Sequence, residues 1–258
     1  MGNNHYYLQG EVMALVFQHG LGANHAQIAT LLKPLKNVRL LTSDVPGHGQ
    51  CPLDSTMEPS FNAYTDEIIR IMDLAGIYKA VIGGLSMGSG IAVNMACRYP
   101  KRVAGLILHR PAWELSPRPQ NLAILLKVAQ YVDNMDEGKS SFMQLPEFQS
   151  IQASLPKAAG SLLGMFERDQ QAHTARVLTK MVEDKPCPTN TTPMITFPAL
   201  VIGNDDDPLH PWEMAEAWHK ILPNSHLKKV TSRYRNDQAH QDQVVAAIQQ
   251  FMNTIRIN

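Results

Sequence analysis

Residues 80–88 read AVIGGLSMG and combine a strand, a tight turn and the start of a helix in nine positions. The apolar run Ala80 to Gly83 is typical of a buried strand, and Gly88 to Arg98 has the small and apolar residues of a packed helix. The turn between them carries the pattern G-x-S-x-G, which occurs by chance but seldom at a strand–helix junction. A serine on such a turn points away from the sheet, and the amides of the next helix favour a developing negative charge. We therefore expect Ser86 to be a nucleophile.

On both sides of this turn, short apolar runs alternate with helical patterns. Further apolar runs cover residues 13–17, 38–42, 103–108, 199–202 and 227–231, and helical patterns cover residues 24–35, 60–74, 212–221 and 241–255. Nearly continuous apolar strands separated by helices are typical of a parallel sheet that is covered on both faces. The sequence therefore predicts an α/β fold with a mostly parallel, doubly wound sheet.

The alternation stops between Pro111 and about Pro193, where only helical patterns are found. We therefore expect a core of residues 1–111 and 197–258, interrupted by a helical insertion at residues 112–196. Some apolar side chains of the insertion can line a pocket, although most are expected to form its own core. These candidates are Trp113, Leu122, Leu125, Leu126, Met143, Leu162, Leu163, Met165 and Phe166.

Composition excludes several classes of function. Lys and Arg together equal Asp and Glu, so the net charge is zero, which argues against a nucleic-acid partner and against electrostatic binding to a membrane. The N-terminus lacks the basic and apolar regions of a signal peptide, and no apolar run is long enough to span a bilayer. Cys51, Cys97 and Cys187 are too few and too widely spaced for a disulfide framework or a zinc site. A cytoplasmic location without a metal is the expectation.

A serine nucleophile needs an imidazole base, and the base needs an acid behind it. Of the histidines, His240 falls in the polar segment between the last strand and the last helix, at the edge where parallel sheets form their ligand crevice. Three adjacent carboxylates follow the strand at residues 199–202, and they cannot all be buried cheaply. Asp205 is expected to be solvated, which leaves Asp206 and Asp207 as candidate acids.

A glycine-containing loop, His19-Gly20-Leu21-Gly22, ends the first strand of the core. Glycines suit any tight turn, so the loop alone indicates little. Next to the Ser86 turn, it can present the Leu21 amide to an oxyanion beside the amide of Met87.

These motifs, in the order Ser86, Asp207, His240, resemble those of the α/β-hydrolase family over nearly the whole chain. Asp44-Val45-Pro46-Gly47-His48-Gly49 resembles the family's D-x-P-G-x-G loop, and residues 112–196 resemble its helical cap. The spacing from the acid to Pro211 favours Asp207, whereas the spacing from Gly203 favours Asp206. We prefer Asp207. Only one strand fits before Met13 where fuller members have two, so the antiparallel edge strand is expected to be absent.

The resemblance implies a serine hydrolase that cleaves an ester-like bond of a small acyl substrate without a cofactor. Ser86 would attack, His240 would be the base and Asp207 the acid, with Leu21 and Met87 as oxyanion donors. Carbon–carbon bond hydrolases, thioesterases, lactonases and acyltransferases use the same residues and remain alternatives. A ligand-binding member without turnover is a further alternative, although such proteins typically lose a triad residue.

Overall fold

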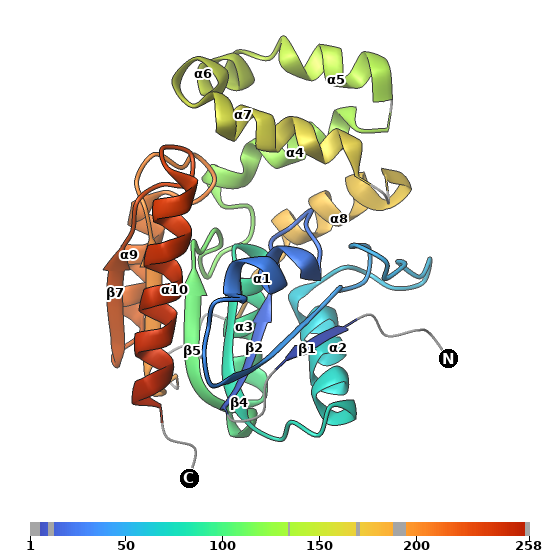
Figure 1. Cartoon of the computed structure of the whole chain (residues 1–258). Coiled ribbons are helices and arrows are strands. Elements are labelled where there is room, and N and C mark those ends of the chain that lie inside the picture. The colour runs from blue at the N-terminus through green and yellow to red at the C-terminus, as the bar shows by residue number, and fades with distance from the viewer. Residues whose placement is uncertain (1–5, 10–12, 134, 169–170, 188–194, 256–258) are drawn as a thin grey trace.

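The computed structural model of the 258-residue chain describes residues 6–9, 13–133, 135–168, 171–187 and 195–255. Its centre is one seven-stranded sheet with the strand order β1-β3-β2-β4-β5-β6-β7 (Figure 1). The strands are β1 (Tyr6–Gln9), β2 (Met13–Gln18), β3 (Val38–Ser43), β4 (Ala80–Leu85), β5 (Val103–His109), β6 (Ala199–Gly203) and β7 (Ser225–Lys229).

The six strands from β2 to β7 are parallel, which confirms the predicted fold class. Val16 on β2 pairs with Leu41 on one side and with Ile82 on the other, and all three side chains are buried. In the described part of the N-terminal segment, one strand, β1, precedes Met13, as expected. It runs antiparallel to β3, so the expectation that the antiparallel edge strand is absent was wrong.

Helices cover both faces of the sheet. On one face, α1 (His25–Leu32) and α10 (Asp237–Thr254) share a buried cluster with side chains of β2, β4 and β5. On the other face lie α2 (Phe61–Leu74), α3 (Met87–Arg98) and α9 (Trp212–Ile221). The sheet is therefore doubly wound. Because helices cover both of its faces, a ligand site is expected at the carboxyl ends of the parallel strands.

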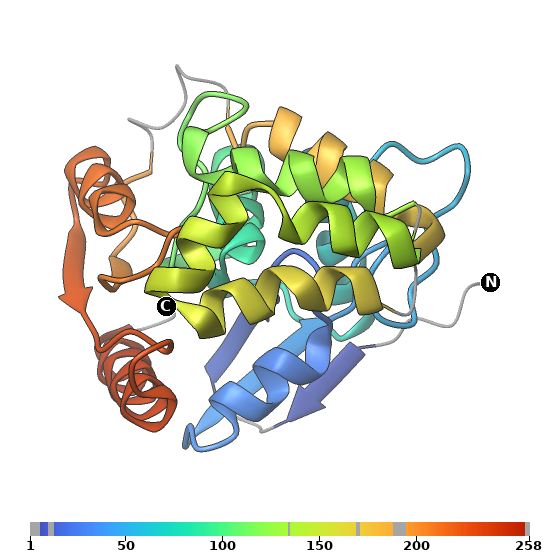
Figure 2. The same cartoon turned by 90° about the horizontal axis from the view of Figure 1, so that it is seen from above.

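Five further helices form a layer above the carboxyl ends of the strands (Figures 1 and 2). They are α4 (Ala123–Tyr131), α5 (Met135–Met143), α6 (Pro146–Ser154), α7 (Pro156–Leu163) and α8 (Gln171–Glu183). Phe142, Phe148 and Phe166 are buried there, and the Phe142 ring packs at a tilt against the other two, with centroid distances of 5.1 Å to Phe148 and 5.4 Å to Phe166. We call these helices the cap. Residues 134, 169–170 and 188–194 of the expected insertion lie outside the described residues, and the division at 111 and 197 stays a prediction.

Cys97 at the end of α3 forms a disulfide with Cys187, which follows α8. The expectation that the cysteines form no disulfide was therefore wrong. The two residues are 90 positions apart in the chain, and they meet because the cap returns to the core beside α3. This bond ties the end of the cap to the helix that begins at the Ser86 turn.

Within the described part of the chain, no helix combines the length and the hydropathy that a bilayer crossing needs.

Candidate active site

Ser86 stands on the turn between β4 and α3 with φ 56° and ψ −112°, a conformation that non-glycine residues seldom adopt. The flanking glycines make this turn possible. A Cβ atom at Gly84 would lie 2.1 Å from the Gly88 carbonyl carbon, and one at Gly88 would lie 2.2 Å from the Gln18 oxygen. The backbone N–H of Ser86 donates to the His109 oxygen at 2.9 Å, which fixes the turn to β5. The serine hydroxyl is thus held above the strand ends.

The imidazole that meets Ser86 belongs to His210. Its Nε2 lies 2.9 Å from Ser86 Oγ, and its Nδ1 lies 2.9 Å from Asp207 Oδ1. The backbone N–H of His210 donates to the same carboxylate oxygen at 3.2 Å. Asp207 and His210 both lie in the loop that follows β6, so one loop brings the acid and the imidazole to the serine.

His240 is not brought to Ser86, and the expectation of a Ser86–His240 pair is corrected. Asn236 caps α10 by accepting a hydrogen bond from the Ala239 amide, so the helix begins at Asp237 instead of residue 241. His240 is therefore in the first turn of a helix and not in a loop. Its Nδ1 lies 2.7 Å from the Thr231 oxygen, and its Nε2 lies 3.3 Å from Nε2 of His109.

Of the two candidate acids, Asp207 is the one that lies in the site. Its carboxylate is buried, whereas Asp206 is exposed and forms an ion pair with Arg235 at 2.9 Å. Asp205 is also exposed and pairs with Lys229 at 2.7 Å. The spacing to Pro211 was the more informative of the two family spacings.

Arg110 is the residue of the site that the sequence did not reveal. It follows β5 with a positive φ of 50°, and its buried guanidinium donates from Nε to Asp207 Oδ2 at 2.7 Å. Its Nη2 lies 3.4 Å from the Tyr234 hydroxyl. Asp207 thus divides its oxygens, with Oδ1 toward His210 and Oδ2 toward Arg110. The sequence offered one signal for this contact. Arg110 directly follows one core strand, and the acidic loop of Asp207 directly follows another.

Charge and burial set the protonation of these groups. Burial alone would raise the pKa of Asp207, but His210 and Arg110 beside it hold that pKa far below its ordinary value. Burial lowers the pKa of His210, and the nearby Arg110 lowers it further, although Asp207 partly offsets both effects. His210 is therefore neutral near pH 7, the form that can accept a proton.

The loop of residues 19–22, which we call the oxyanion loop, lies next to Ser86. A Cβ atom at Gly20 would be 3.6 Å from Ser86 Cβ. The Gly20 amide donates to Gln27 Oε1 at 3.0 Å, which braces the loop against α1, and Leu21 lines the pocket. Met87 is the first residue of α3, so its N–H has no acceptor within the helix. Leu21 and Met87 thus lie in the segments beside Ser86, and their role as oxyanion donors stays a prediction.

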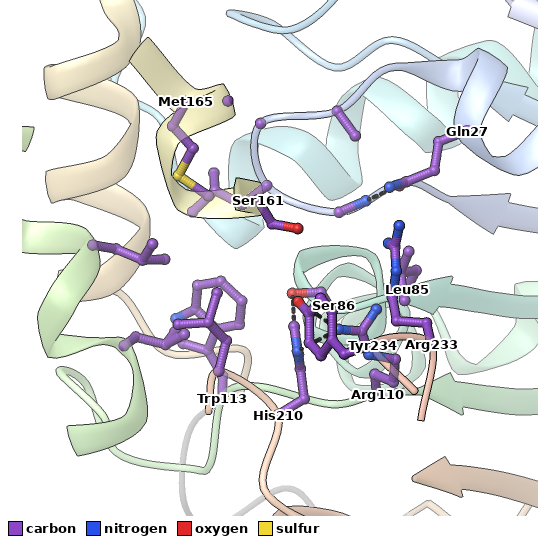
Figure 3. Close-up of a pocket in the computed structure, with 18 residues that line it drawn as sticks. Gln27, Leu85, Ser86, Arg110, Trp113, Ser161, Met165, His210, Arg233 and Tyr234 are labelled. Atoms are coloured by element: carbon purple, nitrogen blue, oxygen red, sulfur yellow. Dashed lines mark hydrogen bonds between the residues drawn. The ribbon is translucent and has the colours of Figure 1, made fainter. Parts of the chain in front are cut away.

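A pocket of about 340 Å³ opens above Ser86 (Figure 3). Trp113, Leu122, Leu125 and Met165 line it from α4 and from the segments next to the cap helices, and these four were among the candidates from the sequence. Leu162 and Phe166 are buried in the cap instead. In Figure 3, Met165 and Ser161 face the Ser86–His210 pair across the cavity. On the cap side the lining is apolar apart from Ser161, and at the strand ends it includes the polar side chains of Ser86, Arg110 and His210.

Among the described residues, no group of three His, Cys, Asp or Glu side chains could hold a metal ion.

Comparison with known proteins agrees with this architecture. A family model described as alpha/beta hydrolase fold matches residues 14–239. The chain is 25% identical over 238 residues to a protein of Stutzerimonas stutzeri (strain A1501) that is provisionally named a carbamate hydrolase, with 86% of each chain covered.

Two solved structures are similar over almost their whole length. One is an alpha/beta hydrolase enzyme from a Medee basin deep-sea metagenome library, with a TM-score of 0.78, 18% identity and coverage of 99% of this chain and 96% of that one. The other is a thermophilic esterase from Thermogutta terrifontis with malate bound, with a TM-score of 0.75, 21% identity and coverage of 96% and 94%. At these identities, the likeness bears on the fold alone.

Proposed function

Because this chain belongs to the α/β-hydrolase family, we propose that it is a serine hydrolase that cleaves an ester-like bond of a small molecule through an acyl-enzyme intermediate. The observation that carries the proposal is the contact between Ser86 Oγ and His210 Nε2 at 2.9 Å, with Asp207 Oδ1 behind the imidazole. Nucleophile, base and orienting acid are thus within hydrogen-bond reach of one another.

In the first step, Ser86 Oγ attacks the ester carbonyl while His210 Nε2 takes the hydroxyl proton. The tetrahedral oxyanion accepts hydrogen bonds from the Leu21 and Met87 amides, each of which can be worth about 3 kcal/mol. Collapse of this intermediate breaks the bond to the alcohol, which leaves with the proton from His210. Asp207 stabilises the transient imidazolium and keeps Nδ1 as its donor.

In the second step, water attacks the acyl-enzyme and gives its proton to His210. The carboxylic acid then leaves as the proton returns to Ser86. The cap shields this cavity, which limits the access of bulk water to the acyl group. No step requires a metal or a cofactor.

The test uses a fluorophosphonate probe and short p-nitrophenyl esters. The wild-type protein should be labelled at Ser86, and Ser86→Ala should lose both labelling and turnover while it keeps the wild-type melting temperature, since a small residue suits the turn. Labelling of the Ala variant, or esterase activity close to that of the wild type, would refute the assignment of the nucleophile.

The cytoplasmic location expected from the sequence stays a prediction. The Cys97–Cys187 disulfide is of a kind more common in oxidising compartments. Trapping the thiols in intact cells and counting the free cysteines would test this, because a protein in the reducing cytoplasm should have three free cysteines and one in an oxidising compartment should have one.

A further inference from the structure

Arg233 brings a positive charge to the wall of the pocket at Ser86. It lies in the loop between β7 and α10, and it lines both this pocket and a cavity of about 130 Å³ that shares Gln27 and Leu85 with it. In Figure 3, Trp113 and Arg233 lie on opposite sides of Ser86. The nucleophile is therefore between an apolar wall and a cationic wall, and the mechanism proposed above makes no use of the cation.

The charge of Arg233 has no close partner within the protein. Among the described residues it forms one ion pair, with Asp237, and the distance from Nε to Oδ1 is 3.9 Å. The side chains of Arg233 and Asp237 are 38% and 54% exposed, so this pair is weak. Arg110, the other arginine of the pocket wall, is instead buried against Asp207. Arg233 therefore supplies a positive charge that the protein leaves largely uncompensated.

The pocket itself offers Arg233 no carboxylate. Within the described part of the chain, the residues that line the pocket include neither Asp nor Glu. Arg235, in the same loop, is exposed and is not among the lining residues, and it pairs with Asp206 at 2.9 Å. The arginine of this loop that faces solvent is thus paired, whereas the one at the pocket is open to an anionic ligand.

Tyr234 positions the guanidinium of Arg233. The ring of Tyr234 is buried, and its centroid lies 5.8 Å from the guanidinium carbon of Arg233 and 5.6 Å from that of Arg110. A guanidinium that packs against an aromatic ring still has its N–H groups available for hydrogen bonds. In the part of the chain that the structure describes, no side chain or carbonyl accepts a hydrogen bond from Arg233. Its donors are therefore free for a substrate.

The charge of Arg233 acts on the reacting groups. Burial is the main cause that lowers the pKa of His210, and the charges of Arg110 and Arg233 lower it further, whereas Asp207 raises it. Such an effect falls off with distance, so Arg233 is close enough to the base for its charge to be felt there. An anion bound at Arg233 would accordingly lie near the bond that Ser86 attacks.

Resting on the function proposed above, we propose that the preferred substrates are esters that carry a carboxylate on one side of the scissile bond, and that Arg233 binds this carboxylate. The planar fork of a guanidinium matches a carboxylate in geometry and in charge. The opposite, uncharged part of the ester then lies against the apolar wall formed by Trp113, Leu122 and Leu125.

The test uses two pairs of esters, and each pair differs in one charge. The first pair carries the charge in the acyl part and consists of the p-nitrophenyl half-ester of adipic acid and p-nitrophenyl hexanoate. The second pair carries it in the alcohol part and consists of p-acetoxybenzoate and its methyl ester. The measured quantity is the ratio of kcat/KM for the charged ester to kcat/KM for the neutral one. The pair that responds identifies the side of the bond on which the carboxylate lies.

In Arg233→Gln, this ratio should fall about 10-fold in one of the two pairs, at the lower end of what a hydrogen bond to a charged group contributes, because Arg233 is partly exposed. Arg233→Lys, which keeps the charge without the planar fork, should retain part of the preference. Arg235→Gln is the matched control from the same loop and should keep the wild-type ratio. A change in the pKa of His210 affects both esters of a pair alike, so it cancels in the ratio.

Two results would overturn the proposal. One is a ratio that is the same in Arg233→Gln as in the wild type for both pairs. The other is an equal fall in Arg235→Gln, which would assign the preference to the overall charge of the loop. Raised salt should lower the ratio in the wild type and leave it unchanged in Arg233→Gln, since salt screens an exposed charge.

A binding measurement without turnover separates this proposal from the hydrolase proposal. In Ser86→Ala, adipate should raise the melting temperature, and the shift should be lost when Arg233→Gln is added. If no ester is hydrolysed and the fluorophosphonate probe does not label Ser86, the hydrolase proposal fails, and this shift alone decides the role of Arg233. A shift with inorganic phosphate as large as that with adipate would indicate a general anion site and would overturn the assignment to a carboxylate.

Discussion

Replacing Asp207 by Asn should damage catalysis and stability together, because the two carboxylate oxygens serve different partners. Oδ1 faces His210 and Oδ2 faces Arg110, and both side chains of the ion pair are almost inaccessible to solvent. Loss of the orienting carboxylate should lower kcat about 10⁴-fold, as in triads generally. The same change leaves the guanidinium of Arg110 buried without a counter-charge.

The stability loss can be bounded from this burial. Breaking a buried ion pair by removing one partner costs about 3–5 kcal/mol. In a chain of this size, about 2–4 °C of melting temperature corresponds to 1 kcal/mol, so the melting temperature should fall by about 6–20 °C. The double variant Arg110→Met, Asp207→Asn has neither charge of the ion pair, so no unpaired guanidinium remains buried. Its melting temperature should return to within a few degrees of the wild type, while kcat stays low.

The assays are calorimetric melting and ester turnover, with Asp206→Asn as the matched control. Asp206 is exposed, so its variant should change neither quantity measurably. An unchanged melting temperature in Asp207→Asn would refute the buried pair, and an unchanged kcat would refute the role of the acid. If the double variant Arg110→Met, Asp207→Asn regained turnover, Asp207 would have no role as the acid of the site, and the separation of its catalytic role from its role in stability would be wrong.

The remaining predictions concern the histidines and the disulfide. His210→Gln should lower kcat about 10⁴-fold or more, whereas His240→Gln should keep kcat within a few-fold; the opposite ranking in ester turnover would restore the expectation from the sequence. Because the pKa of His210 is lowered, kcat/KM should rise with pH through a value below 6.5 and be level above it; a profile that still rises above pH 7, with chemistry rate-limiting, would contradict a buried His base. Burial lowers the pKa of His19 and of His240 to about 4, so the unfolded state binds more protons between about pH 6.5 and 4. The free energy of unfolding should therefore decrease as the pH is lowered through that window, and urea titrations that show it constant would contradict the burial of these neutral imidazoles. Reducing the Cys97–Cys187 bond, which closes a loop of 90 residues, should cost up to about 5 kcal/mol of stability; an unchanged melting temperature with dithiothreitol would show that the bond is not formed in solution.

The features that depend on a short stretch of sequence could be predicted from the chain: the nucleophile turn, the acid, and most strands and helices. The turn at Ser86 needs glycines on both sides, and those glycines are visible in the chain. The carboxylate of Asp207 contacts His210 and Arg110, and the spacing from Asp207 to Pro211 pointed to this residue. Strands and covering helices followed from apolar runs, and their observed ends differ from the predicted ones by a few residues.

The base was missed for a physical reason. The helix α10 starts four residues earlier than its apolar pattern indicates. Its N-cap residue is Asn236, and an apolar pattern takes no account of a polar residue that begins a helix. This moved His240 from a loop into a helix. His210, three residues after Asp207, satisfies the same chain order of serine, acid and histidine.

Contacts between distant segments could not be predicted at all. Cys97 and Cys187 meet only because the cap folds back onto α3. Arg168 reaches Gly22 only because the cap covers the oxyanion loop. No periodicity or spacing encodes either approach, since each depends on how two layers pack.

The short separation between Asp207 and His210 places the acid and the base on a single stretch of four residues, so that grafting one loop can transfer both with their mutual geometry. The loop after β7, in which Arg233 and Tyr234 line the pocket, is a separate segment, but it is not independent of the triad. The Tyr234 hydroxyl lies 3.4 Å from Arg110 Nη2, and the charge of Arg233 helps to lower the pKa of His210. A library confined to residues 230–236 should therefore change the reactivity of Ser86 toward fluorophosphonate together with specificity wherever Arg233 or Tyr234 is replaced.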